Sequence, residues 1–92
     1  MIVRILGEDQ LEVPDAELVR LSALDQAVVA ACANGDRAEC AAALTALLEG
    51  VREAGFPLVT DEPGPSDLVL PSADASLAEV SALLTTDGLI SP

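Results

Sequence analysis

Residues 15–57 carry the stretch that decides the fold, DAELVRLSALDQAVVAACANGDRAECAAALTALLEGVREAGFP. Apolar residues recur at steps of three and four on both sides of Asn34-Gly35, which is typical of two amphipathic helices. Gly35 can adopt the left-handed conformation that ends a helix, and Gly55 with Pro57 ends the second one. Because the connection between the helices is so short, the sequence predicts an antiparallel helical hairpin.

Acidic residues are predicted to begin both helices of this hairpin. Asp15, after Pro14, is expected to cap the first helix, and Asp36 the second, where Glu39 follows as in a capping box. The expected buried positions are Leu18, Leu21, Leu24, Val28 and Ala31 in the first helix, and Cys40, Leu44, Leu47, Leu48 and Val51 in the second. Glu17, Arg20 and Asp25 lie off the first stripe. Gly50 marks either a close contact between the helices or local slack.

Short apolar runs on either side of the hairpin indicate strands. Residues 2–6 alternate, with Val3 and Ile5 facing one way, and residues 11–13 alternate again after a polar loop over residues 7–10, which predicts an N-terminal β-hairpin. Residues 67–70 form a third run that ends at Pro71. Since proline is tolerated at the margin of a sheet and not in its middle, this run is expected to be an edge strand.

The C-terminal part of the chain predicts one more helix. Ser76 and Glu79 form a capping box ahead of an apolar stripe (Leu77, Val80, Leu83 and Leu84). Asp87-Gly88 is expected to end this helix, and residues 89–90 to fold back as a last strand or apolar clip. With only 92 residues, the chain is predicted to be one α+β domain. That domain combines a β-hairpin, an antiparallel helical hairpin, a short third strand and a C-terminal helix around one small core.

The charge of the chain excludes several classes of partner. Sixteen Asp and Glu stand against four Arg, with no Lys and no His, so the formal net charge is -12. Such a chain lacks the cationic surface that nucleic acids require, and anionic lipid repels it. No apolar run approaches the roughly 20 residues of a membrane-spanning helix, and the apolar start over residues 1–6 is too short for a secretory signal. We therefore expect a cytoplasmic protein, although composition and spacing alone do not identify its function.

Catalytic, cofactor and metal sites are not expected either. The serines have no His to act as a base, and most carboxylates fall at helix caps or on polar faces. A deep pocket with two buried carboxylates would reopen the question of an enzyme. Asp61, Glu62 and Asp67 cluster, yet their spacing fits no calcium loop, and a solvated loop is the preferred interpretation.

Two cysteines flank the predicted turn. Cys32 and Cys40 each lie four residues from Asp36, so in an antiparallel hairpin they sit at similar heights. A disulfide is conceivable between them. The preferred interpretation is two small buried side chains that stay reduced in the cytosol.

Five segments of the chain resemble the PspAA family of PspA-associated proteins. They are MIVRILGEDQ (1–10), ALDQAVVAACANGD (23–36), VREAGFPL (51–58), PSDLVLPSADASLAEV (65–80) and DGLI (87–90). The resemblance implies a small non-enzymatic partner of PspA, a coiled-coil, membrane-remodelling protein of the phage-shock-type envelope stress system. It also implies a cytosolic adaptor or regulator, recruited to the inner face of the membrane only through its partner.

The third strand is the predicted contact surface. An unpaired strand edge can accept a partner strand, although Pro14 and Pro71 could equally blunt the edges of this sheet. The predicted partner-binding residues are Asp67, Leu68, Val69, Leu70 and Asp74. Since the chain is acidic, binding to a basic surface of PspA is expected to weaken with salt. The alternative is a self-assembling structural module that forms a homo-oligomer through the sheet edge or the Ala-rich helical face.

Overall fold

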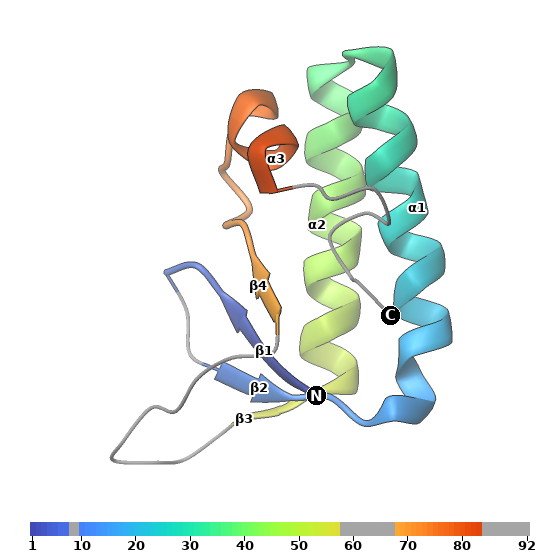
Figure 1. Cartoon of the computed structure of the whole chain (residues 1–92), viewed down its shortest axis with the longest axis vertical. Coiled ribbons are helices and arrows are strands. Elements are labelled where there is room, and N and C mark those ends of the chain that lie inside the picture. Colours follow the sequence, from blue (N-terminus) through green and yellow to red (C-terminus); the bar gives the residue numbers. More distant parts are fainter. Residues whose placement is uncertain (8–9, 58–67, 84–92) are drawn as a thin grey trace.

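The computed structural model describes residues 1–7, 10–57 and 68–83. The elements in chain order are β1 (Ile2–Ile5), β2 (Gln10–Glu12), the 3-10 turn η1 (Asp15–Glu17), α1 (Leu18–Asn34), α2 (Arg37–Ala54), β3 (Phe56–Pro57), β4 (Leu68–Leu70) and α3 (Leu77–Leu83). Figure 1 shows α2 lying between the sheet and α1, with α3 beside the upper part of the helical hairpin. This arrangement confirms the predicted α+β fold.

The four strands form a mixed sheet in the order β3-β2-β1-β4. β1 runs antiparallel to β2, with Val3 opposite Leu11, and parallel to β4, with Arg4 opposite Val69. β4 therefore lies at the edge of the sheet, as predicted. The two-residue strand β3, which pairs with β2, was not predicted. It is too short to produce an alternating pattern of its own.

The core lies between the inner face of the sheet and the helical hairpin. β1 alternates as predicted, because Val3 and Ile5 are buried while Arg4 between them is not. The buried apolar residues are Val3, Ile5, Val13, Leu21, Val28, Ala31, Cys40, Leu44, Leu47, Leu48, Val51, Leu70 and Val80. All five predicted core positions of α2 belong to this set. In α1, Leu18 and Leu24 are half-buried and pack against it.

Two of the three predicted N-terminal helix caps are present, and the predicted glycine ends α1. Gly35 follows α1 with a φ of 69°, and Asp36 accepts a hydrogen bond from the Glu39 N–H at 3.0 Å. At α3, the Glu79 N–H donates to Ser76 Oγ at 3.1 Å. The prediction for Asp15 is wrong, because Pro14 precedes a 3-10 turn and no side chain caps it. The chain enters the helical region one residue earlier than expected, which places Asp15 inside the turn.

Two polar residues expected in solvent are buried instead. Asp25 is only 1% exposed, because it lies one turn from both Leu21 and Val28 and so falls within the core-facing arc of α1. Gln10, predicted in a loop, is the first residue of β2 and is also buried. Among the described residues, every buried side-chain nitrogen or oxygen has a hydrogen-bond partner. The Asp25 side chain lies on the buried side of α1, whereas Gln10 is opposite Arg4 in the register, so its side chain is buried on the face of the sheet that points away from α2.

Gly50 marks a close contact between the two long helices. A Cβ atom at this position would lie 2.8 Å from Leu24 Cδ1 and 3.2 Å from Leu21 Cδ2. The missing side chain thus lets α2 approach α1 closely, and the interpretation of Gly50 as slack is wrong.

Several predictions fall outside the described residues. They are the polar loop over residues 61–66, Asp67, Leu84, the helix end at Asp87-Gly88 and the clip at residues 89–90. Within the described part of the chain, no helix has the length and apolar character needed to cross a bilayer.

Candidate partner-binding surface and cysteine pair

Among the described strands, none pairs with the outer edge of β4, and within β4 the residue whose backbone faces that edge is Val69. The Leu6 N–H donates to the Leu70 carbonyl oxygen at 2.9 Å, so the backbone of Leu70 faces β1. Since successive residues of a strand point their backbone groups to opposite sides, the N–H and C=O of Val69 point away from β1. Pro71 follows directly and has no N–H. The edge can therefore offer a partner strand only a short stretch of backbone.

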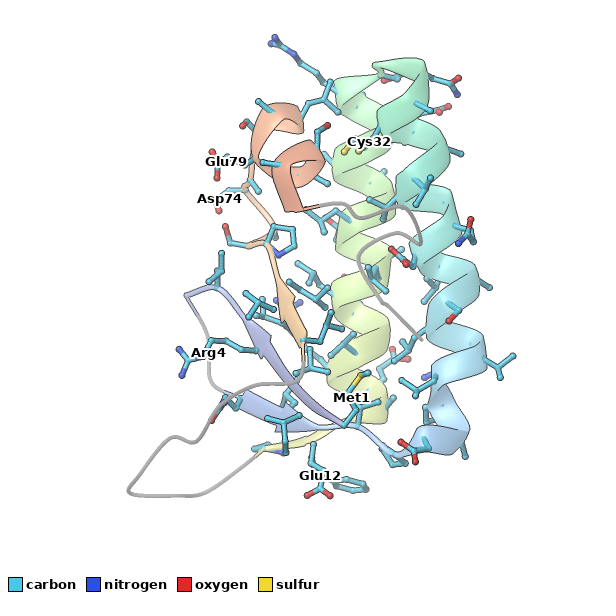
Figure 2. The ribbon with its side chains drawn as sticks, viewed as in Figure 1. Met1, Arg4, Glu12, Cys32, Asp74 and Glu79 are labelled. Carbon is cyan, nitrogen blue, oxygen red and sulfur yellow. The ribbon has the colours of Figure 1, made fainter. Side chains whose placement is uncertain are left out.

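Exposed apolar side chains also lie on the face of the sheet that adjoins this edge. The register places Ile2, Arg4 and Val69 on the face opposite Val3 and Ile5, and Phe56 joins that face opposite Glu12. The large exposed apolar residues here are Leu6, Phe56 and Val69, which are 44%, 66% and 40% exposed. We call this surface, Leu6, Phe56 and Val69 with Arg4 and Glu12, the outer sheet face. In Figure 2, Arg4 and Glu12 point away from α2.

The five predicted contact residues differ in their exposure to solvent. Val69 and Asp74 are exposed, whereas Leu70 is fully buried and Leu68 half-buried, because both side chains face the core. Asp74 accepts a hydrogen bond from Ser72 Oγ at 2.7 Å. Asp67 lies outside the described residues. The side chains of Val69 and Asp74 can therefore contact a partner protein, whereas the side chain of Leu70 cannot.

The sequence analysis named only Val69 of this surface as a contact residue, and Phe56 is the most exposed apolar residue that it missed. It is the one aromatic residue of the chain, and it follows the end of α2 directly. A large apolar side chain placed between Gly55 and Pro57, outside every periodic stripe, was the signal available in the sequence. An exposed aromatic residue on the face of a sheet is typical of a protein contact.

The two cysteines meet between the helices, as their spacing predicted. Cys32 Sγ lies 3.3 Å from Cys40 Sγ, and both thiols are free. Cys40 is buried and Cys32 is half-buried. Burial raises the pKa of the Cys40 thiol from 9.0 to about 11, and the hydrogen bond and charge of Cys32 act in the same direction. At neutral pH the Cys40 thiol is therefore protonated.

This pKa shift predicts a loss of stability in alkaline solution. Between pH 9 and 11 the unfolded chain gives up the Cys40 proton while the folded chain keeps it, so the free energy of unfolding falls as the pH rises. The chain has no Lys and no Tyr to obscure the effect. Urea unfolding followed by circular dichroism from pH 8 to 11 measures the slope. The Cys40→Ala variant should have a shallower slope, and an equal slope would contradict the assignment.

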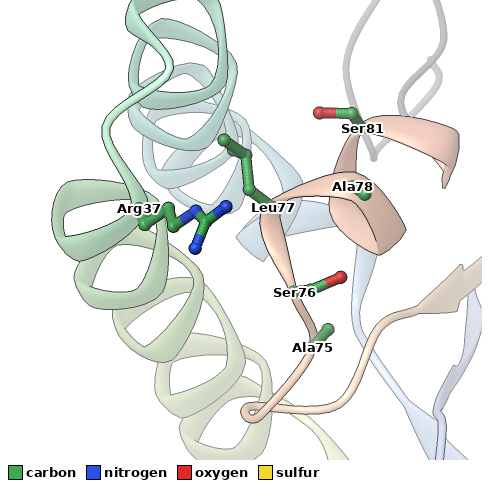
Figure 3. A pocket seen from close by; sticks show the side chains of 6 residues that line it. All are labelled: Arg37, Ala75, Ser76, Leu77, Ala78 and Ser81. Carbon is green, nitrogen blue, oxygen red and sulfur yellow. The ribbon is translucent and has the colours of Figure 1, made fainter.

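A surface pocket lies between the start of α2 and α3 (Figure 3). It has a volume of about 600 Å³ and is lined by Arg37, Ala75, Ser76, Leu77, Ala78 and Ser81. Arg37 is the one charged residue among the described residues that line it, and none of those lining residues is a carboxylate. Within residues 1–7, 10–57 and 68–83, no three Cys, Asp or Glu side chains gather as metal ligands do. The cluster of Asp61, Glu62 and Asp67 lies outside these ranges.

A family model, PspAA, described as PspA-Associated protein, matches residues 1–92, the whole chain. No curated protein and no solved structure matches the chain significantly.

Proposed function

The chain belongs to the family of PspA-associated proteins, and from this membership we propose that it is a non-enzymatic cytoplasmic adaptor or regulator that binds a PspA-type coiled-coil protein. The observation that carries the proposal is the match of all 92 residues to a family described by its association with PspA. In this proposal the chain reaches the inner face of the membrane only through its partner. The net charge of -12 supports that order of events, since anionic lipid repels the chain itself.

The outer sheet face is the proposed contact surface. Its exposed apolar side chains, Leu6, Phe56 and Val69, can be buried by an apolar stripe of a partner helix. The open backbone of Val69 adds two hydrogen-bonding groups at the margin of this surface. Acidic residues dominate the chain as a whole, which favours a partner with basic residues beside its apolar stripe. The apolar contact supplies affinity, and the charges set the rate and register of binding.

The first test is the salt dependence of binding to PspA. The purified 92-residue chain is titrated against PspA at low and at high salt, with the dissociation constant measured by calorimetry. Because screening weakens long-range attraction, we expect the affinity to fall by about tenfold or more between roughly 50 mM and 500 mM salt. Absence of binding at low salt and high concentration would overturn the proposed function. The molar mass from light scattering shows whether the chain binds as a monomer.

The second test locates the contact with two matched substitutions. Val69→Lys places a charge on the outer sheet face, while Val19→Lys places the same charge on α1, where the side chain is 82% exposed. Both variants change the net charge equally, so a difference between them reports on position alone. We expect Val69→Lys to weaken binding by about tenfold or more and Val19→Lys to change it little. Circular dichroism confirms that both variants fold.

The opposite result would relocate the contact. If folded Val69→Lys binds as wild type does and Val19→Lys does not, the partner binds the helical hairpin and the outer sheet face is not the contact. A Phe56→Ala variant gives an independent readout from the other end of the same face. Its side chain is 66% exposed, so truncation affects binding far more than folding.

A further inference from the structure

We propose that Cys32 and Cys40 form a site of reversible oxidation, at which one intramolecular disulfide joins α1 to α2. Their Sγ atoms already lie 3.3 Å apart, although the two residues belong to different helices. Both are free thiols in the structure, so the site is present in its reduced form. The inference does not depend on binding to PspA.

The position of the pair in the hairpin allows the sulfur atoms to close the remaining gap. A disulfide bond is about 2.05 Å long, so the two sulfurs must approach by roughly 1.3 Å. Cys32 lies in the last turn of α1 and Cys40 in the first turn of α2, next to the glycine-containing connection. Helix ends adjust more easily than helix interiors. At the other end of the hairpin, Gly50 packs tightly against Leu21 and Leu24, and comparable movement there would be resisted.

The difference in burial assigns the order of the chemical steps. With a low-molecular-weight disulfide as the oxidant, the thiolate of half-buried Cys32 attacks one oxidant sulfur and releases one thiol. The Cys40 sulfur, as the thiolate, then attacks Cys32 Sγ and releases the second thiol. Two electrons pass from the protein to the oxidant, and the two protons of the cysteines end on the two released thiols. Since burial keeps Cys40 protonated at neutral pH, the second step accelerates as the pH rises.

The test uses the full-length protein in buffers with different ratios of reduced to oxidised glutathione. Free thiols are trapped with an alkylating reagent, and the products are weighed by mass spectrometry. We expect a monomer that has lost two hydrogen atoms, resists alkylation at both cysteines and returns to the reduced form with dithiothreitol. The oxidised protein should unfold at a higher urea concentration than the reduced protein, because the cross-link restricts the unfolded chain.

Two comparisons separate the effect of the fold from that of mere closeness in sequence. The Cys40→Ser variant should stop at the mixed disulfide of Cys32 with glutathione. For the wild-type chain, the ratio of internal disulfide to mixed disulfide should be at least about tenfold lower in denaturing urea than under native conditions. The reason is that the folded hairpin supplies the high effective concentration of one thiol near the other. Equal ratios in native and denaturing conditions would overturn the proposal. So would a native protein that yields only glutathione adducts, intermolecular dimers or two free thiols at every ratio.

Discussion

Replacing Leu47 with alanine is expected to lower the free energy of unfolding by about 2 to 5 kcal/mol. Leu47 is fully buried, and it lies on the face of α2 between two points that contact α1. One is Cys40, whose sulfur meets Cys32, and the other is Gly50, which packs against Leu21 and Leu24. Because the Gly50 contact keeps α2 close to α1, the structure can collapse only in part into the space that the lost side chain leaves.

A loss of this size is a large part of the total stability of a small domain, which is of the order of 5 to 15 kcal/mol. The chain contains no Trp and no Tyr, so urea unfolding is best followed by far-ultraviolet circular dichroism. Val19→Ala serves as the control, because Val19 is 82% exposed in the same helical hairpin. We expect this control to change the free energy of unfolding by about 0.5 kcal/mol or less. Similar losses in both variants would contradict the packing described here.

The helical hairpin was the most predictable part of the fold. Its signals are local, because the spacing of Leu44, Leu47 and Leu48, the cap at Asp36 and the end at Gly35 all lie within one stretch of sequence. The cysteine contact follows from the same geometry, since Cys32 and Cys40 are equally distant from the turn. Such features need no knowledge of how distant segments meet.

The sheet and its outer face were predictable only in part. The parallel pairing of β1 with β4 and the addition of β3 depend on contacts between segments far apart in the sequence. The register of β4 also decides which side chain reaches solvent, and a shift of one residue exchanges Val69 with Leu70. For this reason the sequence predicted the edge strand correctly but could not separate its exposed residue from its buried ones. Phe56 could be assigned to the outer sheet face only from the pairing of β3 with β2, which the sequence did not predict.

Asp25 shows where an apolar stripe is an incomplete guide to burial. The stripe of α1 contains only apolar residues by definition, so a carboxylate beside it is assigned to solvent. The arc of a helix that faces a core is wider than such a stripe, and Asp25 lies inside that arc between Leu21 and Val28. A buried polar group is stable only when it is hydrogen-bonded. Asp25 has such a polar interaction, and no buried side-chain nitrogen or oxygen among the described residues lacks a partner.

Removal of this carboxylate is therefore expected to be costly. Asp25→Ala should lower the free energy of unfolding by roughly 1 to 3 kcal/mol, because a buried carboxylate loses its polar interaction and leaves a space that the fold does not fill. Asp25→Asn keeps the shape and one acceptor oxygen and should lose less. Gln26→Ala, at the exposed neighbouring position, is the control and should leave stability nearly unchanged. Urea unfolding of the three variants gives the comparison. If Asp25→Ala had the same free energy of unfolding as the wild type, the buried carboxylate would make no net contribution to stability, and this prediction would be wrong.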